Sequence, residues 1–210
     1  MTLSYEEICN LLGLDRNKDK EAADYILNIP NHGNSLLNIL RSHSGKEFFV
    51  IGNGPPVHDL SSIYGKGIIV VADSAIWKIK RPYVPEIIVT DLDGDTDRIL
   101  ELSDSGSIVF VHAHGDNMQK IKEIAKNFKG HFIPTNQIPE YPGNFGGFTD
   151  GDRAAYISDY LGASKIVLVD FNFSIQNGKP WNERKQIKLN IAKRLLEELG
   201  EENRQKLIGL

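Results

Sequence analysis

The chain has 210 residues, of which 40% are hydrophobic, and its formal net charge is −4. This length suits one domain with at most a small addition, and the composition excludes an intrinsically disordered protein. The net negative charge argues against a nucleic-acid-coating protein, which is usually basic. A single cysteine, Cys9, excludes an intrachain disulfide and fits a cytoplasmic protein. No apolar run is long enough to span a membrane, and the first residues do not resemble a signal peptide, so neither nucleic acid nor membrane is an expected partner.

Residues 1–46 have the pattern of short helices. Ser4 and Glu7 have the spacing of a capping box, and apolar residues recur at helical spacing after them. Breaks are expected at Gly13 and at residues 30–34. Because the segment carries no chemical motif, we expect a small helical appendage that packs on a main domain of residues 47–210 or on a second subunit.

From residue 47 onward, short apolar runs alternate with helical patterns. The runs lie at residues 48–51, 68–71, 87–89, 108–111, 132–133 and 166–169. Continuous runs of this kind are typical of strands that are buried on both faces. Helices are expected at residues 118–128, 154–161 and 183–199. The alternation predicts an α/β fold with a doubly wound, mostly parallel sheet.

Small and polar residues gather directly after the predicted strands. The segments are Gly52-Asn53-Gly54-Pro55, Ala72-Asp73-Ser74, Asp91-Leu92-Asp93, His112-Ala113-His114-Gly115-Asp116-Asn117 and Asp170-Phe171-Asn172. In doubly wound sheets, ligands bind beyond the carboxyl ends of the strands. The gathering of glycines, carboxylates and imidazoles at one sheet edge therefore predicts an active site.

The acidic segment after the third apolar run has two interpretations. Asp91 and Asp93 alternate along an extended chain, so both carboxylates can face one side and hold Mg²⁺. The same residues could instead form a solvated cap of the next helix. Asp95 is assigned to the start of that helix.

The glycines and histidines also leave alternatives open. Gly52 and Gly54 allow close approach of a phosphate or nucleoside, or they form a tight turn, since neither a dinucleotide fingerprint nor a P-loop is complete. His112 and His114 could chelate zinc, because the segment resembles the His-x-His-x-Asp-His motif of the metallo-β-lactamase fold. Asn117 replaces the last histidine of that motif, which makes zinc the weaker alternative.

A glycine-rich segment at residues 146–151 leads into a helix. Thr149 and Asp152 have capping spacing. Aspartates in the first turn can supply the negative charge that a helix N-terminus favours, without a bound anion. Arg153 could instead bind a phosphate in a bidentate manner. Arg184, Lys185 and Lys188 are further candidates for phosphate binding, although a solvated helix face is the simpler interpretation.

Several of these segments occur in the order found in a known family. They are Asn53-Gly54-Pro55, Ala72-Asp73-Ser74-Ala75, Val89-Thr90-Asp91-Leu92-Asp93-Gly94, Val111-His112-Ala113-His114-Gly115-Asp116-Asn117 and Gly147-Phe148-Thr149-Asp150-Gly151-Asp152-Arg153-Ala154. Over roughly residues 47–195, the chain resembles the archaeal 6-hydroxymethyl-7,8-dihydropterin pyrophosphokinase family. That family is similar in fold to thiamin pyrophosphokinase, and a related domain occurs in bacterial flagellin-glycosylation accessory proteins.

The resemblance implies Mg²⁺-dependent transfer of pyrophosphate from ATP to a reduced pterin, with release of AMP, in tetrahydromethanopterin or folate-type cofactor synthesis. It implies that Asp91, Asp93 and Asp116 hold Mg²⁺ and that Arg153 also acts in catalysis. The residues expected to contact nucleotide, phosphate or pterin are Gly52, Asn53, Gly54, Pro55, Asp73, His112, His114, Asn117, Asp150 and Asp152.

A homodimer is expected from the fold relatives of this family. Two alternatives from other functional classes stay open. One is a zinc-dependent hydrolase that uses the histidine segment, and the other is a nucleotide- or sugar-nucleotide-binding module without kinase activity.

Overall fold

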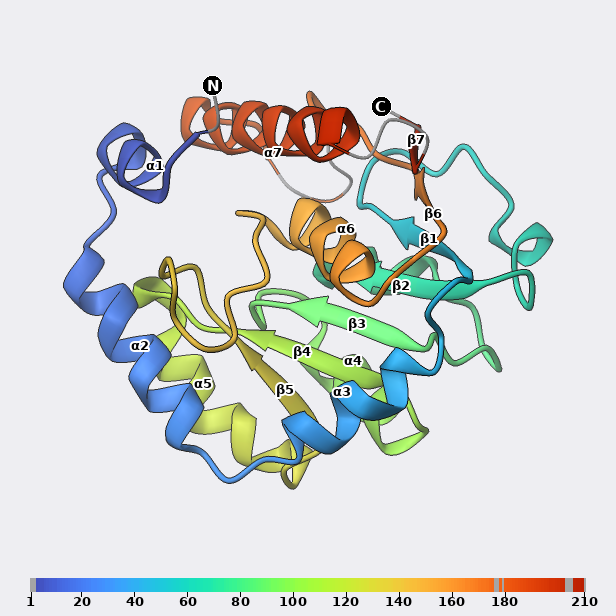
Figure 1. Ribbon diagram of the computed structural model, residues 1–210, viewed down its shortest axis with the longest axis horizontal. Coiled ribbons are helices and arrows are strands. Elements are labelled where there is room, and N and C mark those ends of the chain that lie inside the picture. The colour runs from blue at the N-terminus through green and yellow to red at the C-terminus, as the bar shows by residue number, and fades with distance from the viewer. Residues whose placement is uncertain (1–2, 176–177, 179, 203–205, 210) are drawn as a thin grey trace.

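The computed structural model describes residues 3–175, 178, 180–202 and 206–209. A seven-stranded parallel sheet has the spatial order β5-β4-β3-β2-β1-β6-β7 (Figure 1). The strands are β1 Glu47–Ile51, β2 Ile68–Ala72, β3 Ile87–Thr90, β4 Ile108–His112, β5 Phe132–Thr135, β6 Lys165–Val169 and β7 Leu207–Ile208. The α/β fold is thus confirmed. The short edge strand β7 was not predicted, because two residues give no periodic signal.

Helices flank the sheet and precede it. The α-helices are α1 Tyr5–Leu12, α2 Arg16–Asn28, α3 Gly33–Arg41, α4 Thr96–Asp104, α5 Met118–Ile124, α6 Asp150–Tyr160 and α7 Glu183–Glu202. Short 3-10 helices are η1 Leu60–Ser62, η2 Asp73–Lys78, η3 Gly115–Asn117 and η4 Ala125–Phe128. Ser4 and Glu7 form the expected capping box of α1, and Asp95 caps α4 by accepting a hydrogen bond from the Arg98 amide.

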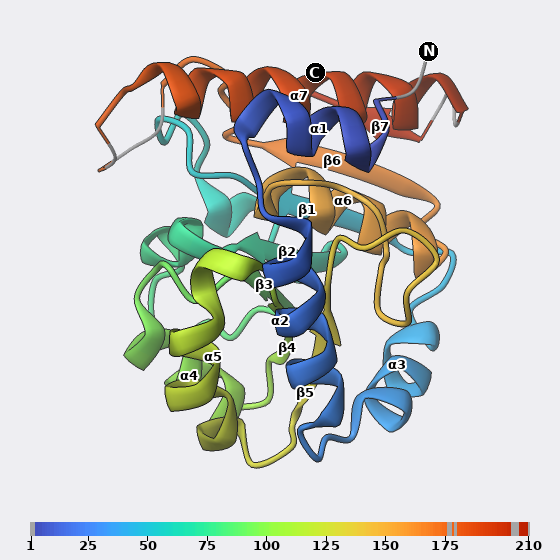
Figure 2. The ribbon, with the colours of Figure 1, turned by 90° about the vertical axis from the view of Figure 1, so that its left-hand side faces the viewer.

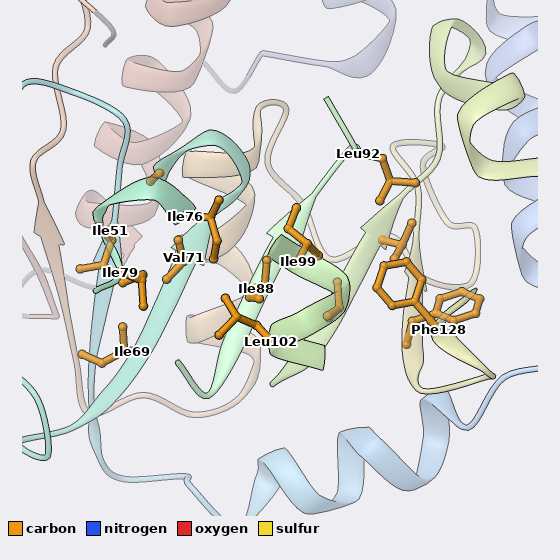
Figure 3. Packing of buried hydrophobic residues seen from close by; sticks show 14 of the residues in the cluster. Ile51, Ile69, Val71, Ile76, Ile79, Ile88, Leu92, Ile99, Leu102 and Phe128 are labelled. Carbon is orange, nitrogen blue, oxygen red and sulfur yellow. The ribbon is translucent and has the colours of Figure 1, made fainter. Parts of the chain in front are cut away.

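The continuous apolar runs arise because both faces of the sheet are covered. Phe48 and Val50 of β1 belong to a core that includes residues of α3, α6 and α7. Phe49 and Ile51 point to the other face, into a core that includes residues of α2, η2, α4 and α5. Figure 3 shows part of this second core, with strand residues packed beside those of η2 and α4. A strand between two such cores has no solvent face on which polar residues could alternate.

The strand order reverses beside β1. Strands β2 to β5 extend to one side of β1, whereas β6 and β7 lie on the other. Ligands of open α/β sheets bind beyond the carboxyl strand ends at such a reversal.

The N-terminal helices pack on the rest of the chain near this edge. In Figure 2, α2 lies in front of the sheet. Helix α1 packs on α7 through Ile8, Leu12, Ile191 and Leu195. Within the described residues, no helix combines the length and the apolar character that crossing a membrane requires.

Candidate active site

A cavity of about 370 Å³ lies at the carboxyl ends of the strands. Segments that follow β1 to β6 line it, together with parts of α2 and α7. The sequence-predicted residues in its lining are Gly52, Asn53, Gly54, Asp73, Asp91, Asp93, His112, His114, Asp116, Asp150 and Asp152. Pro55, Asn117 and Arg153 lie outside this lining. The convergence expected at one sheet edge is therefore observed.

Three carboxylates converge in the cavity. Asp73, Asp91 and Asp150 each offer an oxygen atom, and these atoms lie within 4.8 Å of one another. The three residues, called the carboxylate group below, come from the ends of β2 and β3 and from the first turn of α6. Carboxylates this close repel one another unless a cation or a proton lies between them. An all-oxygen donor set of this kind fits Mg²⁺.

Asp73 is held in a fixed orientation by its neighbours. Its buried carboxylate accepts hydrogen bonds from the hydroxyls of Thr90 (2.6 Å) and Ser74 (2.7 Å) and from the Gly94 amide (3.1 Å). These contacts join the loops after β2 and β3, so the first two members of the carboxylate group are positioned together.

Asp93 and Asp116 do not join the carboxylate group. The carboxylate of Asp93 is half exposed and accepts a hydrogen bond from Lys120 Nζ at 2.6 Å, whereas Asp116 is exposed in η3. The alternation assumed for Asp91 and Asp93 does not hold, because β3 ends at Thr90 and Leu92 has a left-handed φ of 67°. The expected role of Asp93 and Asp116 as metal ligands stays a prediction.

The two histidines occupy different environments. His112 is buried, and its Nδ1 lies 3.0 Å from the hydroxyl of Thr135. Its Nε2 has no partner at close hydrogen-bond geometry in the part of the chain that the structure describes. Burial, with the charges of Arg153 and His114, lowers the pKa of His112 well below its ordinary value, so its ring is neutral. His114 Nε2 lies 3.7 Å from Asp91 Oδ2. Within the described residues, the histidines do not form a metal-binding group with Asp116.

Asn117 joins the loops after β3 and β4. Its side-chain amide donates to the carbonyl oxygens of Asp91 (2.8 Å) and His112 (2.7 Å), and its oxygen accepts from the His114 amide. All of these partners are backbone groups. Asn117 thus holds the acidic loop against the histidine loop, and its expected contact with phosphate stays a prediction.

Arg153 lies buried outside the cavity lining. It donates to the carbonyl oxygen of Phe148 at 2.9 Å. Burial lowers the pKa of Arg153, and this effect outweighs the nearby negative charges of Asp150, Asp152 and Asp91, which raise it. The guanidinium therefore acts as an internal counter-charge for the acidic residues, and its expected phosphate contact stays a prediction. Gly147 has a φ of 77°, and a Cβ there would lie 2.4 Å from Arg153 Cα, so only glycine fits this turn.

With this geometry established, comparisons with known proteins identify the family. A family model described as 6-hydroxymethylpterin diphosphokinase MptE-like matches residues 21–178. The chain belongs to this family. Because its members are named diphosphokinases, the zinc-hydrolase alternative gains no support from the comparison.

Curated relatives of this MptE-like chain carry the same kind of name. It is similar to 6-hydroxymethyl-7,8-dihydropterin pyrophosphokinase of Methanocaldococcus jannaschii, with 37% identity over 90% of this chain and 84% of the relative. The enzymes of the same name from Pyrococcus furiosus and Methanothermobacter thermautotrophicus are 34% and 32% identical. These matches cover 97% and 92% of this chain, and 94% and 90% of the relatives.

Sequence reasoning missed a buried ion pair beneath the first loop of this MptE-like protein. Lys78 Nζ lies 3.0 Å from Asp170 Oδ2 and donates to the carbonyl oxygens of Gly52 (2.7 Å) and Gly54 (2.8 Å). Burial alone would raise the pKa of Asp170. The hydrogen bonds from His58 and Lys78 outweigh the effect of burial, so the pKa of Asp170 is lowered. In the sequence, Lys78 within the otherwise apolar segment at residues 75–79 gives only a weak indication of this buried ion pair.

The packing of the loop after β1 explains why residue 54 is a glycine. A Cβ on Gly54 would lie 2.5 Å from the carbonyl oxygen of Asp170. The tight packing of the β1 loop against the β6 loop therefore requires Gly54, whatever ligand the loop approaches.

Residues from both ends of the MptE-like chain also line the cavity. Helix α7 contributes Arg184, Lys185 and Lys188, called the α7 cations below, so this helix face borders the cavity and is not only solvated. Helix α2 contributes Lys18 and Asp19. No sequence motif marked α2, because its residues meet the strand ends only through tertiary packing.

Proposed function

We propose that this protein transfers the pyrophosphoryl group of ATP to the hydroxymethyl group of 6-hydroxymethyl-7,8-dihydropterin and releases AMP. The names of the three archaeal relatives support the pterin substrate. The observation that carries the proposal is the carboxylate group, which lies in a cavity at the strand ends where phosphates and a metal ion can meet.

The donor set fits Mg²⁺. Asp73, Asp91 and Asp150 would hold the ion, which would neutralise phosphate charge when bound. Asp93 and Asp116 also line the cavity, and their predicted role as metal ligands stays a proposal beside that of the carboxylate group. Asp91 belongs to both sets.

In the proposed reaction, the hydroxymethyl oxygen attacks the β-phosphorus of ATP. A new P–O bond forms while the hydroxyl proton is lost to water, the bond between the β-phosphorus and the bridging oxygen of the α-phosphate breaks, and AMP leaves. Such a reaction needs an in-line pose and neutralised phosphate charge more than covalent help from the protein. The α7 cations would neutralise the polyphosphate, and the backbone at Gly52, Asn53 and Gly54 would approach the nucleotide.

A product assay tests this function. The purified protein is incubated with ATP, MgCl₂ and 6-hydroxymethyl-7,8-dihydropterin, and the products are separated by chromatography. We expect equal amounts of AMP and pterin diphosphate, and loss of both on addition of EDTA. Binding of ATP without formation of AMP would favour the non-catalytic nucleotide-binding alternative. Activity that persists in EDTA would contradict the metal assignment.

A further inference from the structure

A buried carboxylate that the proposed phosphate chemistry does not use lies in the cavity wall. Asp19 of α2 is only 4% exposed. Its Oδ1 accepts a hydrogen bond from the Gly115 amide at 2.8 Å, and its Oδ2 accepts from Gln137 Nε2 at 2.6 Å and from the Tyr5 hydroxyl at 2.7 Å. All of these donors are neutral. No lysine, arginine or histidine within the described part of the chain forms a salt bridge with Asp19.

A buried carboxylate without a counter-ion is unfavourable unless its lone pairs are satisfied. A carboxylate has about four lone-pair positions, and the hydrogen bonds to Asp19 occupy all but one of them. Asp19 can therefore accept from a ligand without losing a partner.

Two other buried polar side chains, Gln137 and His112, line the same cavity. Gln137 donates to Asp19, and a hydrogen-bonding interaction of its side chain with His112 raises the pKa of that ring against the larger effect of burial. Among the described residues, His112 Nε2 has no partner at close hydrogen-bond geometry. Asp19, Gln137 and His112 are called the α2 recess below. The recess offers a carboxylate, an amide and a neutral imidazole in a desolvated wall, which suits a flat polar heterocycle.

Charge separates this recess from the α7 side of the cavity. The α7 cations attract a polyphosphate, whereas the negative charge of Asp19 repels one. Of the cationic residues of α2, Lys18 borders the cavity, and its side chain is exposed. The ATP phosphates are therefore better placed towards α7 and the carboxylate group, which leaves the α2 recess for the uncharged part of a substrate.

We propose that the α2 recess recognises the pyrimidine edge of the acceptor pterin and that Asp19 is its specificity-determining residue. The 2-amino group of a pterin presents a donor that the one remaining acceptor position of Asp19 can accept. This inference rests on the proposed function and assigns the acceptor half of the same site.

The variant Asp19→Asn tests the inference, because it keeps the size of the side chain but removes the charge and one acceptor oxygen. Binding of 6-hydroxymethyl-7,8-dihydropterin is measured by its fluorescence, and KM values for pterin and ATP are measured separately. We expect Kd and KM for the pterin to rise about tenfold to a hundredfold, and KM for ATP to change less than twofold.

A substrate analogue separates recognition from a structural effect. In 6-hydroxymethyl-7,8-dihydrolumazine, an oxo group replaces the 2-amino group. The wild type should prefer the pterin over this analogue, and Asp19→Asn should lose that preference. The control Tyr5→Phe removes a hydrogen bond to Asp19 but no pterin contact, so it should keep the preference. If Asp19→Asn does not fold, Gln137→Met should raise the pterin Kd at least about fivefold with ATP binding unchanged.

The outcomes distinguish this inference from the proposed function. Binding of pterin by the wild type, lost in Asp19→Asn, supports the recess even if no AMP forms. Transfer by both proteins with equal pterin KM and equal preference overturns the recess and leaves the proposed function standing. A wild type that binds no pterin overturns both.

Discussion

At the scale of single residues, Asp91 and Asp93 lie two positions apart in the sequence but in different environments. Asp91 lies in the carboxylate group, whereas Asp93 pairs with Lys120 after the chain turns at Leu92. The sequence predicted both at a strand end, but the left-handed turn at Leu92 separates them. The Leu92 amide donates to the Thr90 hydroxyl, which in turn donates to Asp73.

Substitution of these two aspartates separates the two metal assignments. Asp91→Asn should lower kcat about a hundredfold or more, because charge stabilisation by a bound metal contributes several kcal/mol. Asp93→Asn should lower it less than about tenfold, because its carboxylate lies outside the carboxylate group. Steady-state kinetics at saturating Mg²⁺ measures both, with thermal melting as a check on folding. Equally large losses for both variants would support the assignment from strand alternation.

The protonation of His112 gives a pH dependence to stability. Below about pH 6.5 an unfolded chain protonates its imidazole, but the buried ring does not, since its pKa is well below that value. The unfolded state then binds more protons, so stability falls as pH falls from about 6.5, by up to about 1.4 kcal/mol per pH unit. Urea unfolding without metal at pH 7.5 to 5 should show a shallower decline for His112→Gln than for the wild type.

The exposed His131 provides a matched control for this experiment. His131→Gln makes the same chemical change on the surface, and it should follow the wild-type curve. Identical curves for His112→Gln and the wild type would contradict the neutral, buried state of His112.

At the scale of elements, burial on both faces made the strands predictable. The apolar runs predicted β1 to β6, because each of these strands lies between two cores. Capping residues such as Ser4 and Asp95 predicted where helices begin. The loop after β1 was less predictable. Its conformation depends on Lys78 and Asp170, which are far apart in the sequence and meet only in the folded chain.

Removal of Lys78 tests how much the loop depends on that ion pair. Lys78→Met leaves Asp170 buried without its cation and removes the donor to two loop carbonyls, so unfolding free energy should fall by about 3–5 kcal/mol. Lys193→Met breaks a half-exposed pair with Glu197 and should change it by less than about 1 kcal/mol. Urea unfolding at pH 7 measures both. Equal effects would show that the Lys78 pair is no more important than a surface pair.

At the scale of the whole molecule, the cavity is completed by segments from the two ends of the chain. The strand ends were predicted from the sequence as its floor. Helix α2 was not predicted as a wall, and the cations of α7 were named for phosphate binding only as an alternative to a solvated helix face. Asp19 and Lys188 have no local pattern that distinguishes them from surface residues of an amphipathic helix. Their role follows only from the way α1 packs on α7 and α2 lies at the strand ends (Figures 1 and 2).

The α7 wall can be tested by removing its charge. Arg184→Gln and Lys188→Gln should each raise KM for ATP about tenfold, because a charged hydrogen bond to phosphate is lost, and should leave KM for the pterin unchanged. Lys193→Gln makes the same change on an exposed part of α7 and serves as the control. A rise in pterin KM without a rise in ATP KM would reverse the assignment of the two walls.

³¹P NMR of the reaction products shows whether the protein transfers an intact pyrophosphoryl group. With ATP, Mg²⁺ and 6-hydroxymethyl-7,8-dihydropterin, we expect the signal of AMP together with the two coupled signals of a pterin diphosphate. Signals of ADP or of inorganic phosphate as the main products would contradict it.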